Sequence, residues 1–131
     1  MIIKLETTSA TPIYVQLRNQ IVMGIGRGEL KIGEGLPTVR QMAQDIGVNT
    51  LTVQKAYEIL KNEGYIEIDR RHGAKVSPKV DISGTFREKL ESELTLLISE
   101  SALKGMSRED FIQICGDLFN GLNISYAGGT A

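Results

Sequence analysis

Apolar residues in the first part of the chain recur at the spacing of an amphipathic helix. One large aliphatic side chain occupies every fourth position, at Ile13, Leu17, Ile21 and Ile25. Such a series lies on one face of a helix. Thr11 and Pro12 before it suit an N-cap and a first helical position. The pattern predicts a first helix that starts at Pro12 and ends among the glycines of residues 24–28.

Two shorter helices are expected next, with only a brief break between them. The apolar positions of the second are Val39, Met42, Ala43 and Ile46, and those of the third are Val53, Ala56, Tyr57 and Leu60. Thr38 and Asn49 are the expected N-caps, and Gly47 and Gly64 are expected to end the two helices. Two helices separated by so short a glycine turn are typical of a helix-turn-helix.

A β-hairpin is predicted directly after the third helix. Residues 65–69 favour a strand, with Ile66 and Ile68 on one face, and residues 74–76 form a second short strand. The polar stretch of residues 70–73 contains a glycine and is expected to be the turn between them. A hairpin in this place is a wing, so residues 1–80 are predicted to be a winged helix-turn-helix domain.

The rest of the chain, residues 81–131, is predicted to be a helical hairpin. A linker is expected at Pro78 and residues 81–84, followed by one helix up to Gly105 and another that begins with a capping box at residues 107–110. The apolar stripes of the two helices are expected to mediate dimerisation because one helix pair cannot bury them alone. Their residues are Phe86, Leu90, Leu94, Leu97, Phe111, Ile114, Leu118 and Leu122. The glycine-rich tail, residues 126–131, is expected to fray. The fold class is therefore mainly α with a small β wing.

Charge and composition add a contrast between the two parts. The net charge is only −1, yet residues 1–80 carry 11 Lys and Arg against 8 Asp and Glu, while residues 81–131 carry 4 against 8. A basic front and an acidic rear point to different roles. The single cysteine, Cys115, cannot form an internal disulfide and is expected to be a small core residue. Without a secretory signal or a long apolar run, the chain is expected to be cytoplasmic.

The candidate site is the surface that such a domain presents to DNA. A recognition helix enters the major groove with its N-terminal residues, which here are Asn49, Thr50, Leu51, Thr52 and Gln54. Glutamine can bind adenine, and threonine can bind a base edge or a phosphate. Lys55 and Tyr57 of the same helix are further candidate phosphate contacts, with core packing the favoured role of Tyr57. In the wing, the candidates for contact with the DNA backbone or the minor groove are Arg70, Arg71, His72 and Gly73.

The motifs of residues 12–17, 28–33, 36–40, 47–57 and 63–66 together resemble the YtrA-like branch of the GntR family of transcription regulators. The resemblance covers roughly residues 8–77. It implies that Arg40 contacts DNA and that Thr38 supplies a capping hydroxyl where serine is more usual. Thr38 is also counted among the candidate DNA contacts. The wing of this branch usually reads Gly-x-Gly, whereas Arg71, His72 and Gly73 keep only the second glycine. The resemblance also implies a homodimeric repressor of a palindromic operator, acting on a transporter operon.

Three other functions are weighed against operator binding. The chain can be a ligand sensor that holds a small-molecule effector between subunits, since fifty residues are too few to enclose a pocket alone. It can also be a winged helix used only for protein contacts, although the polar and basic residues of the third helix and wing argue against this. An enzyme is disfavoured because one histidine and one cysteine, far apart, form no triad or metal cluster. No metal or cofactor is expected.

Overall fold

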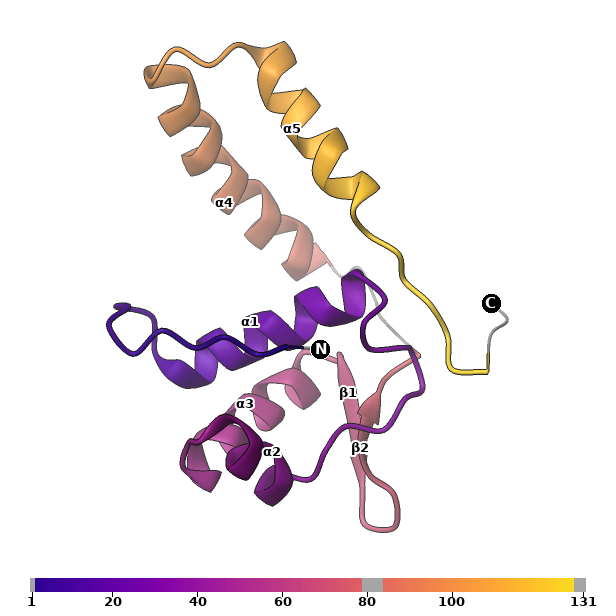
Figure 1. Cartoon of the computed structure of the whole chain (residues 1–131). Helices are drawn as coiled ribbons and strands as arrows, with labels where there is room; N and C mark the ends of the chain where they lie inside the picture. The colour runs from indigo at the N-terminus through magenta and orange to yellow at the C-terminus, as the bar shows by residue number, and fades with distance from the viewer. Residues whose placement is uncertain (1, 79–83, 129–131) are drawn as a thin grey trace. The chain divides into compact units, whose positions relative to one another are not determined.

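The computed structural model describes residues 2–78 and 84–128 and divides the chain into two compact units (Figure 1). The first unit is Met1–Val80 together with Asn123–Ala131, and the second is Asp81–Leu122. The elements are, in order, α1 (Ile13–Gly26), α2 (Val39–Ile46), α3 (Thr50–Asn62), β1 (Ile66–Asp69), β2 (Gly73–Val76), α4 (Gly84–Leu103) and α5 (Arg108–Asn120). The predicted fold class, mainly helical with a small β wing, is confirmed.

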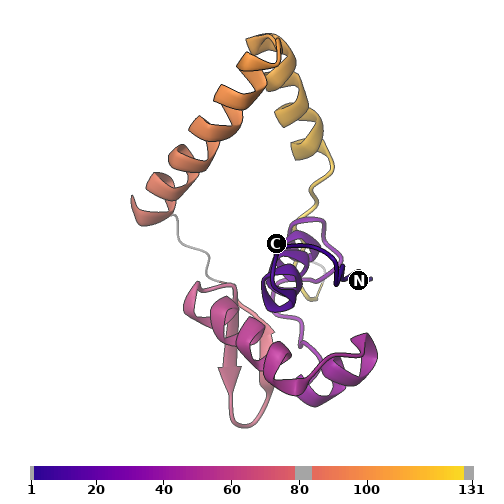
Figure 2. The same ribbon diagram turned by 90° about the vertical axis from the view of Figure 1, so that its left-hand side faces the viewer.

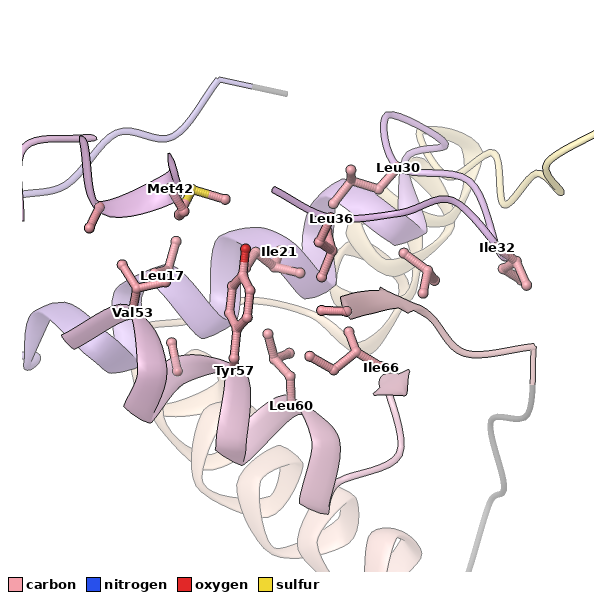
Figure 3. Close-up of a cluster of buried hydrophobic side chains, with 14 residues drawn as sticks. Leu17, Ile21, Leu30, Ile32, Leu36, Met42, Val53, Tyr57, Leu60 and Ile66 are labelled. Carbon is pink, nitrogen blue, oxygen red and sulfur yellow. The ribbon is translucent and has the colours of Figure 1, made fainter. Parts of the chain in front are cut away.

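The first unit is built around α3, against which α1, α2 and β1 all pack. Figure 3 shows the resulting core, in which the side chains of Leu17, Ile21, Val53 and Leu60 are completely shielded from solvent. The predicted stripes of α2 and α3 are confirmed, except that Val39 and Ile46 are only half-buried. Burial of apolar side chains against α3 therefore fixes the orientation of the helix proposed to meet DNA.

The ends of α2 and α3 agree with the sequence. The Thr38 hydroxyl accepts a hydrogen bond from the Gln41 N–H, and the Asn49 side chain accepts one from the Leu51 N–H. Gly47 adopts the left-handed conformation that ends α2, with φ of 69°. The sharp turn between the helices thus has the two caps and the glycine that it needs.

The start of α1 differs from the prediction by one position. Pro12, not Thr11, is the N-cap residue, and no side chain caps the helix. The Thr11 carbonyl instead accepts a hydrogen bond from the Gln16 side chain, which also bonds the backbone of Glu6. A glutamine within the helix therefore holds the preceding segment, so a capping threonine is not required.

The wing is a short antiparallel hairpin with a third segment beside it. Ile66 pairs with Val76 at its base and Asp69 with Gly73 at its tip. On the other edge of β2, the Leu36 N–H donates to the Ala74 carbonyl at 2.8 Å, and the Val76 N–H donates to the Glu34 carbonyl at 2.9 Å. The connection between α1 and α2 therefore supports the wing along its length.

The described part of the C-terminal segment corrects a prediction, because residues 123–127 pair with the first unit instead of fraying. Residues 129–131 of the predicted tail lie outside the described residues. The Ile32 N–H donates to the Ser125 carbonyl, and the Ala127 N–H donates to the Ile32 carbonyl, both at 2.7 Å. Ile32 and Tyr126 form a parallel β-bridge. The physical reason is that the segment beside β2 offers a free backbone edge. The structure places residues from Asn123 in the first unit, whereas the sequence analysis assigned them to the helical region.

The second unit is the helix pair α4 and α5, which contact each other. Ser107 caps α5 by accepting a hydrogen bond from the Asp110 N–H, as half of the predicted capping box requires. No residue of the pair that the structure describes is buried, and Cys115 is half-buried instead of lying in a core. In a pair of helices, the apolar face of each helix can pack only against the other helix, so much of it stays exposed. The predicted linker falls largely on residues 79–83, outside the described residues. None of the described helices has the length and apolar character needed to span a bilayer.

Candidate DNA interface

The N-terminal turn of α3 presents its polar residues around an outward face. The helix buries Val53, Ala56, Tyr57 and Leu60 in the core. At about 100° per residue, Lys55 lies on the opposite side, and Thr50, Thr52 and Gln54 lie at the flanks between the two faces. Thr50, Gln54 and Lys55 are exposed, and Thr52 is half-buried. Of the predicted base-reading side chains of this helix, Thr50 and Gln54 are therefore the ones presented to solvent.

Arg40 stands in the first turn of α2 as a free cation. Its side chain is exposed, and no described residue makes a hydrogen bond or ion pair with its guanidinium. Asp45, an acidic residue of the same helix, accepts a hydrogen bond from the Gln41 side chain at 2.7 Å. The Arg40 guanidinium thus keeps all of its donors for a ligand such as a phosphate or a guanine edge.

Two candidate contacts of α3 have different surroundings. The Lys55 ammonium lies 4.1 Å from the centre of the Tyr14 ring, a cation–π contact that holds an exposed side chain in place. Tyr57 is a core residue, as favoured from the sequence, with only 2% of its surface exposed. Its hydroxyl donates to the Pro37 carbonyl at 2.8 Å, and burial raises its pKa to about 12. Tyr57 therefore ties α3 to the start of α2 and is not available to a phosphate.

The tip of the wing carries its cations on a turn that Asp69 organises. The Asp69 carboxylate accepts hydrogen bonds from the backbone N–H groups of Arg71 and His72 and lies 3.2 Å from the His72 ring nitrogen. These bonds, that of the His72 N–H foremost, hold the pKa of Asp69 below its usual value. Arg70, Arg71 and His72 are all exposed. The turn is thus a preformed loop that presents basic side chains to solvent.

The departure from the usual wing sequence has a simple structural basis. Gly73 adopts a left-handed backbone with φ of 68°, and no described residue other than glycine has a positive φ. Arg71, at the place of the usual first glycine, therefore occupies an ordinary conformation. A three-residue turn followed by one left-handed glycine is a common hairpin connection, so the wing loses nothing in its backbone and gains a cation.

The predicted DNA contacts all lie in the first unit, at the start of α2, in the first half of α3 with its N-cap, and at the wing tip. Figures 1 and 2 show α2 and the wing tip extending from the same side of this unit. Sequence reasoning missed the turn-forming role of Asp69, although an aspartate before a polar loop is a known turn signal. Leu51, which the sequence places among the N-terminal residues of this helix without a role of its own, is 69% exposed in the first turn of α3. In the described residues no group of three or more potential metal ligands is present.

Similar proteins were found for both the sequence and the fold. The family described as Bacterial regulatory proteins, gntR family, matches residues 13–76. The HTH-type transcriptional repressor YtrA of Bacillus subtilis is 34% identical over 109 residues, which are 82% of this chain and 84% of that protein. A match of this length extends beyond the winged helix into the helix pair.

Several solved structures have a fold similar to that of this chain. YtrA of Sulfolobus acidocaldarius, a GntR-family transcription factor, is 38% identical with a TM-score of 0.65, covering 76% of this chain and 99% of that one. A transcriptional antiterminator from Listeria monocytogenes, 24% identical, shares the fold over 98% of both chains with a TM-score of 0.84. The DNA-binding domain of AraR in complex with operator ORR3 is 26% identical with a TM-score of 0.50, over 56% of this chain and 89% of that one. The chain belongs to the YtrA-like branch of the GntR family, transcription regulators with a DNA-binding winged helix-turn-helix.

Proposed function

We propose that this protein is a repressor that binds a palindromic operator as a homodimer, with α3 in the major groove and the wing on the DNA backbone. The observation that carries the proposal is the exposed Arg40 guanidinium, which has no partner among the described residues and belongs to the same unit as the polar first turn of α3 and the cationic wing tip. Arginine is the side chain best suited to bind guanine or phosphate in two-point fashion. The B. subtilis relative YtrA is a transcriptional repressor.

The homodimer part of the proposal rests on the second unit. Large apolar side chains of α4 and α5 are exposed in a single chain, among them Leu97 at 53% and Leu118 at 68%. A second copy would cover them, and two-fold symmetry would then match a palindromic site. The acidic character of residues 81–131 keeps this unit away from phosphates. We further propose that the regulated genes form a transporter operon and that the protein acts in the cytoplasm.

The test is binding of the purified protein to the promoter fragment of its own operon, at several salt concentrations. Wild type is expected to prefer this fragment over random DNA and to weaken steeply as salt rises, because phosphate contacts release counterions. Arg40→Ala is expected to weaken operator binding by roughly tenfold to a hundredfold, the cost of about 1–3 kcal/mol for a lost arginine contact to a base. A phosphate contact would also lower the salt slope by about one.

Arg87→Ala is the matched control for this test. Arg87 is an exposed arginine of the second unit that pairs with Glu91 at 2.9 Å, and its removal is expected to leave operator affinity within about twofold, since exposed pairs contribute little. Equal losses in both variants would show only a general charge effect. Wild-type protein that binds operator and random DNA alike would overturn the proposed function, and absence of DNA binding at low salt would favour a protein-contact role.

A further inference from the structure

Leu51 is an apolar residue on the face of α3 opposite the buried one. It is 69% exposed, whereas Leu60 of the same helix is completely buried. The two residues are separated by nine positions, about two and a half turns, so they point in opposite directions. Among the described residues of α2 and α3, Leu51 is the one large apolar side chain that is exposed. The core therefore does not explain why a leucine stands there.

The groups around Leu51 are polar and hydrogen-bonding. Thr50 precedes it, and Gln54 and Lys55 lie one turn further along the same exposed face. The Asn49 side chain accepts a hydrogen bond from the Leu51 N–H at 2.8 Å, which fixes this residue at the second position of the helix. A single apolar side chain among hydrogen-bonding groups is not a contiguous hydrophobic patch of the kind that binds a protein partner. It matches a surface that is itself polar with isolated methyl groups.

The major-groove edge of DNA is such a surface. Each thymine presents a C5 methyl group beside its O4 acceptor, and the paired adenine presents the N7 and N6 atoms that glutamine binds. Leu51 and Gln54 are one helical turn apart on one face, so they can address neighbouring base pairs. The pairing of an aliphatic and an amide side chain at this point favours A·T pairs in the operator.

We infer that Leu51 determines specificity by packing against the C5 methyl group of one thymine in each operator half-site. This inference rests on the proposed function and names the chemistry of its base recognition. Contact with the methyl group has a consequence that a hydrogen bond from a side chain such as Gln54 does not have. The protein distinguishes thymine from uracil, which differ in this methyl group alone and pair identically with adenine.

The experiment replaces each thymine of the operator fragment in turn by uracil and measures the affinity of wild type, Leu51→Ala, Leu51→Met and Gln54→Ala. In wild type, uracil at one position of each half-site is expected to weaken binding by about fourfold, the worth of one buried methyl group. Leu51→Ala is expected to bind the thymine and uracil forms equally at that position. Leu51→Met, which keeps an apolar side chain of similar reach, is expected to restore the preference.

Two controls separate this inference from the others. Gln54→Ala is expected to bind more weakly and yet keep the thymine preference at the Leu51 position. Because Leu51 is exposed, Leu51→Ala is expected to leave the thermal midpoint unchanged, so any loss reports on DNA. If wild type binds its operator specifically but ignores uracil at every position, or if Leu51→Ala keeps the full preference, the inference is overturned while the proposed function stands. If wild type shows no operator preference at all, both fall.

Discussion

The two units of this protein treat their apolar residues in opposite ways. The first encloses a cluster of fourteen buried hydrophobic side chains among three helices and the wing. The second, a helix pair, has no buried residue among those the structure describes, although it carries large apolar side chains on several sides. A layer of structure must bury its apolar face against another layer to be stable. The first unit does this by itself, and the helix pair needs another surface.

This difference in burial indicates which unit suits DNA binding and which suits association with another copy. A self-contained core can hold Arg40, Gln54 and the wing tip in fixed positions, as a DNA reader requires. The helix pair has no comparable rigid interior, so its sequence is better suited to association. The charge of the two regions follows the same division, with a basic excess up to residue 80 and an acidic excess after it. Each prediction below perturbs one side of this contrast.

The largest effect is expected from charges placed on the helix pair. The double variant Leu97→Glu, Leu118→Glu alters two side chains that are 53% and 68% exposed in a single chain. Burying unpaired carboxylates at a dimer interface costs several kcal/mol, so the dimer dissociation constant is expected to rise at least about a hundredfold. Sedimentation equilibrium measures this directly. Operator affinity is expected to fall with it, because two linked half-site contacts become one.

The control for this variant is Glu88→Gln, Glu93→Gln, which changes exposed charged positions of α4 and leaves its apolar residues intact. It is expected to remain a dimer. Should the double glutamate variant sediment as wild type does, the exposed leucines would have no part in association, and the contrast between the units would need another explanation.

A matched pair of leucines sharpens the contrast at an intermediate scale. Leu60→Ala removes a fully buried side chain of the first unit and is expected to lower the free energy of unfolding by about 2–5 kcal/mol at every protein concentration. Leu118→Ala removes a side chain that the single chain exposes. Its cost is expected to depend on concentration, since it acts through dimer formation. Urea unfolding at two protein concentrations hundredfold apart distinguishes them; a concentration-independent loss at Leu118 would contradict its interface role.

Much of the fold could be predicted because its determinants are local. Thr38, Gly47 and Asn49 specify the turn between α2 and α3 through caps and one left-handed residue, and each has the role that its type favours. The stripe of α3 predicted Leu60 and Tyr57 as core because the helical period leaves one consistent buried face. Such signals depend on nearest neighbours in the chain and need no knowledge of the tertiary structure.

The features that sequence reasoning missed depend on partners far away in the chain. The return of residues 123–127 to Ile32 is a backbone pairing that carries no side-chain signature. The start of α1 shifted because Gln16 bonds a segment ten residues earlier. In the candidate site, the sequence already placed Leu51 among the N-terminal residues of the third helix and away from its buried stripe, and the structure adds that its side chain is 69% exposed.

The smallest expected effect concerns the C-terminal segment, which belongs to the first unit although it follows the helix pair. Gly28 has φ of 80°, and a Cβ atom there would lie 2.2 Å from the Asn123 carbonyl oxygen. Gly28→Ala is therefore expected to displace this segment and to cost about 1–2 kcal/mol from the left-handed backbone alone. Hydrogen exchange of the Ala127 N–H, which bonds the Ile32 carbonyl, is expected to speed up by about tenfold or more.

Gly47→Ala provides the control, because it has a similar left-handed φ of 69° and no atom within 4 Å of an added Cβ. It imposes a comparable backbone strain without touching residues 123–127, so Ala127 exchange is expected to follow only the overall loss of stability. If both variants released the segment equally, the pairing at Ile32 would be a weak attachment that any destabilisation opens. A selective release in Gly28→Ala would instead show that residues 123–127, which follow the helix pair, are held specifically by the segment around Ile32 between α1 and α2.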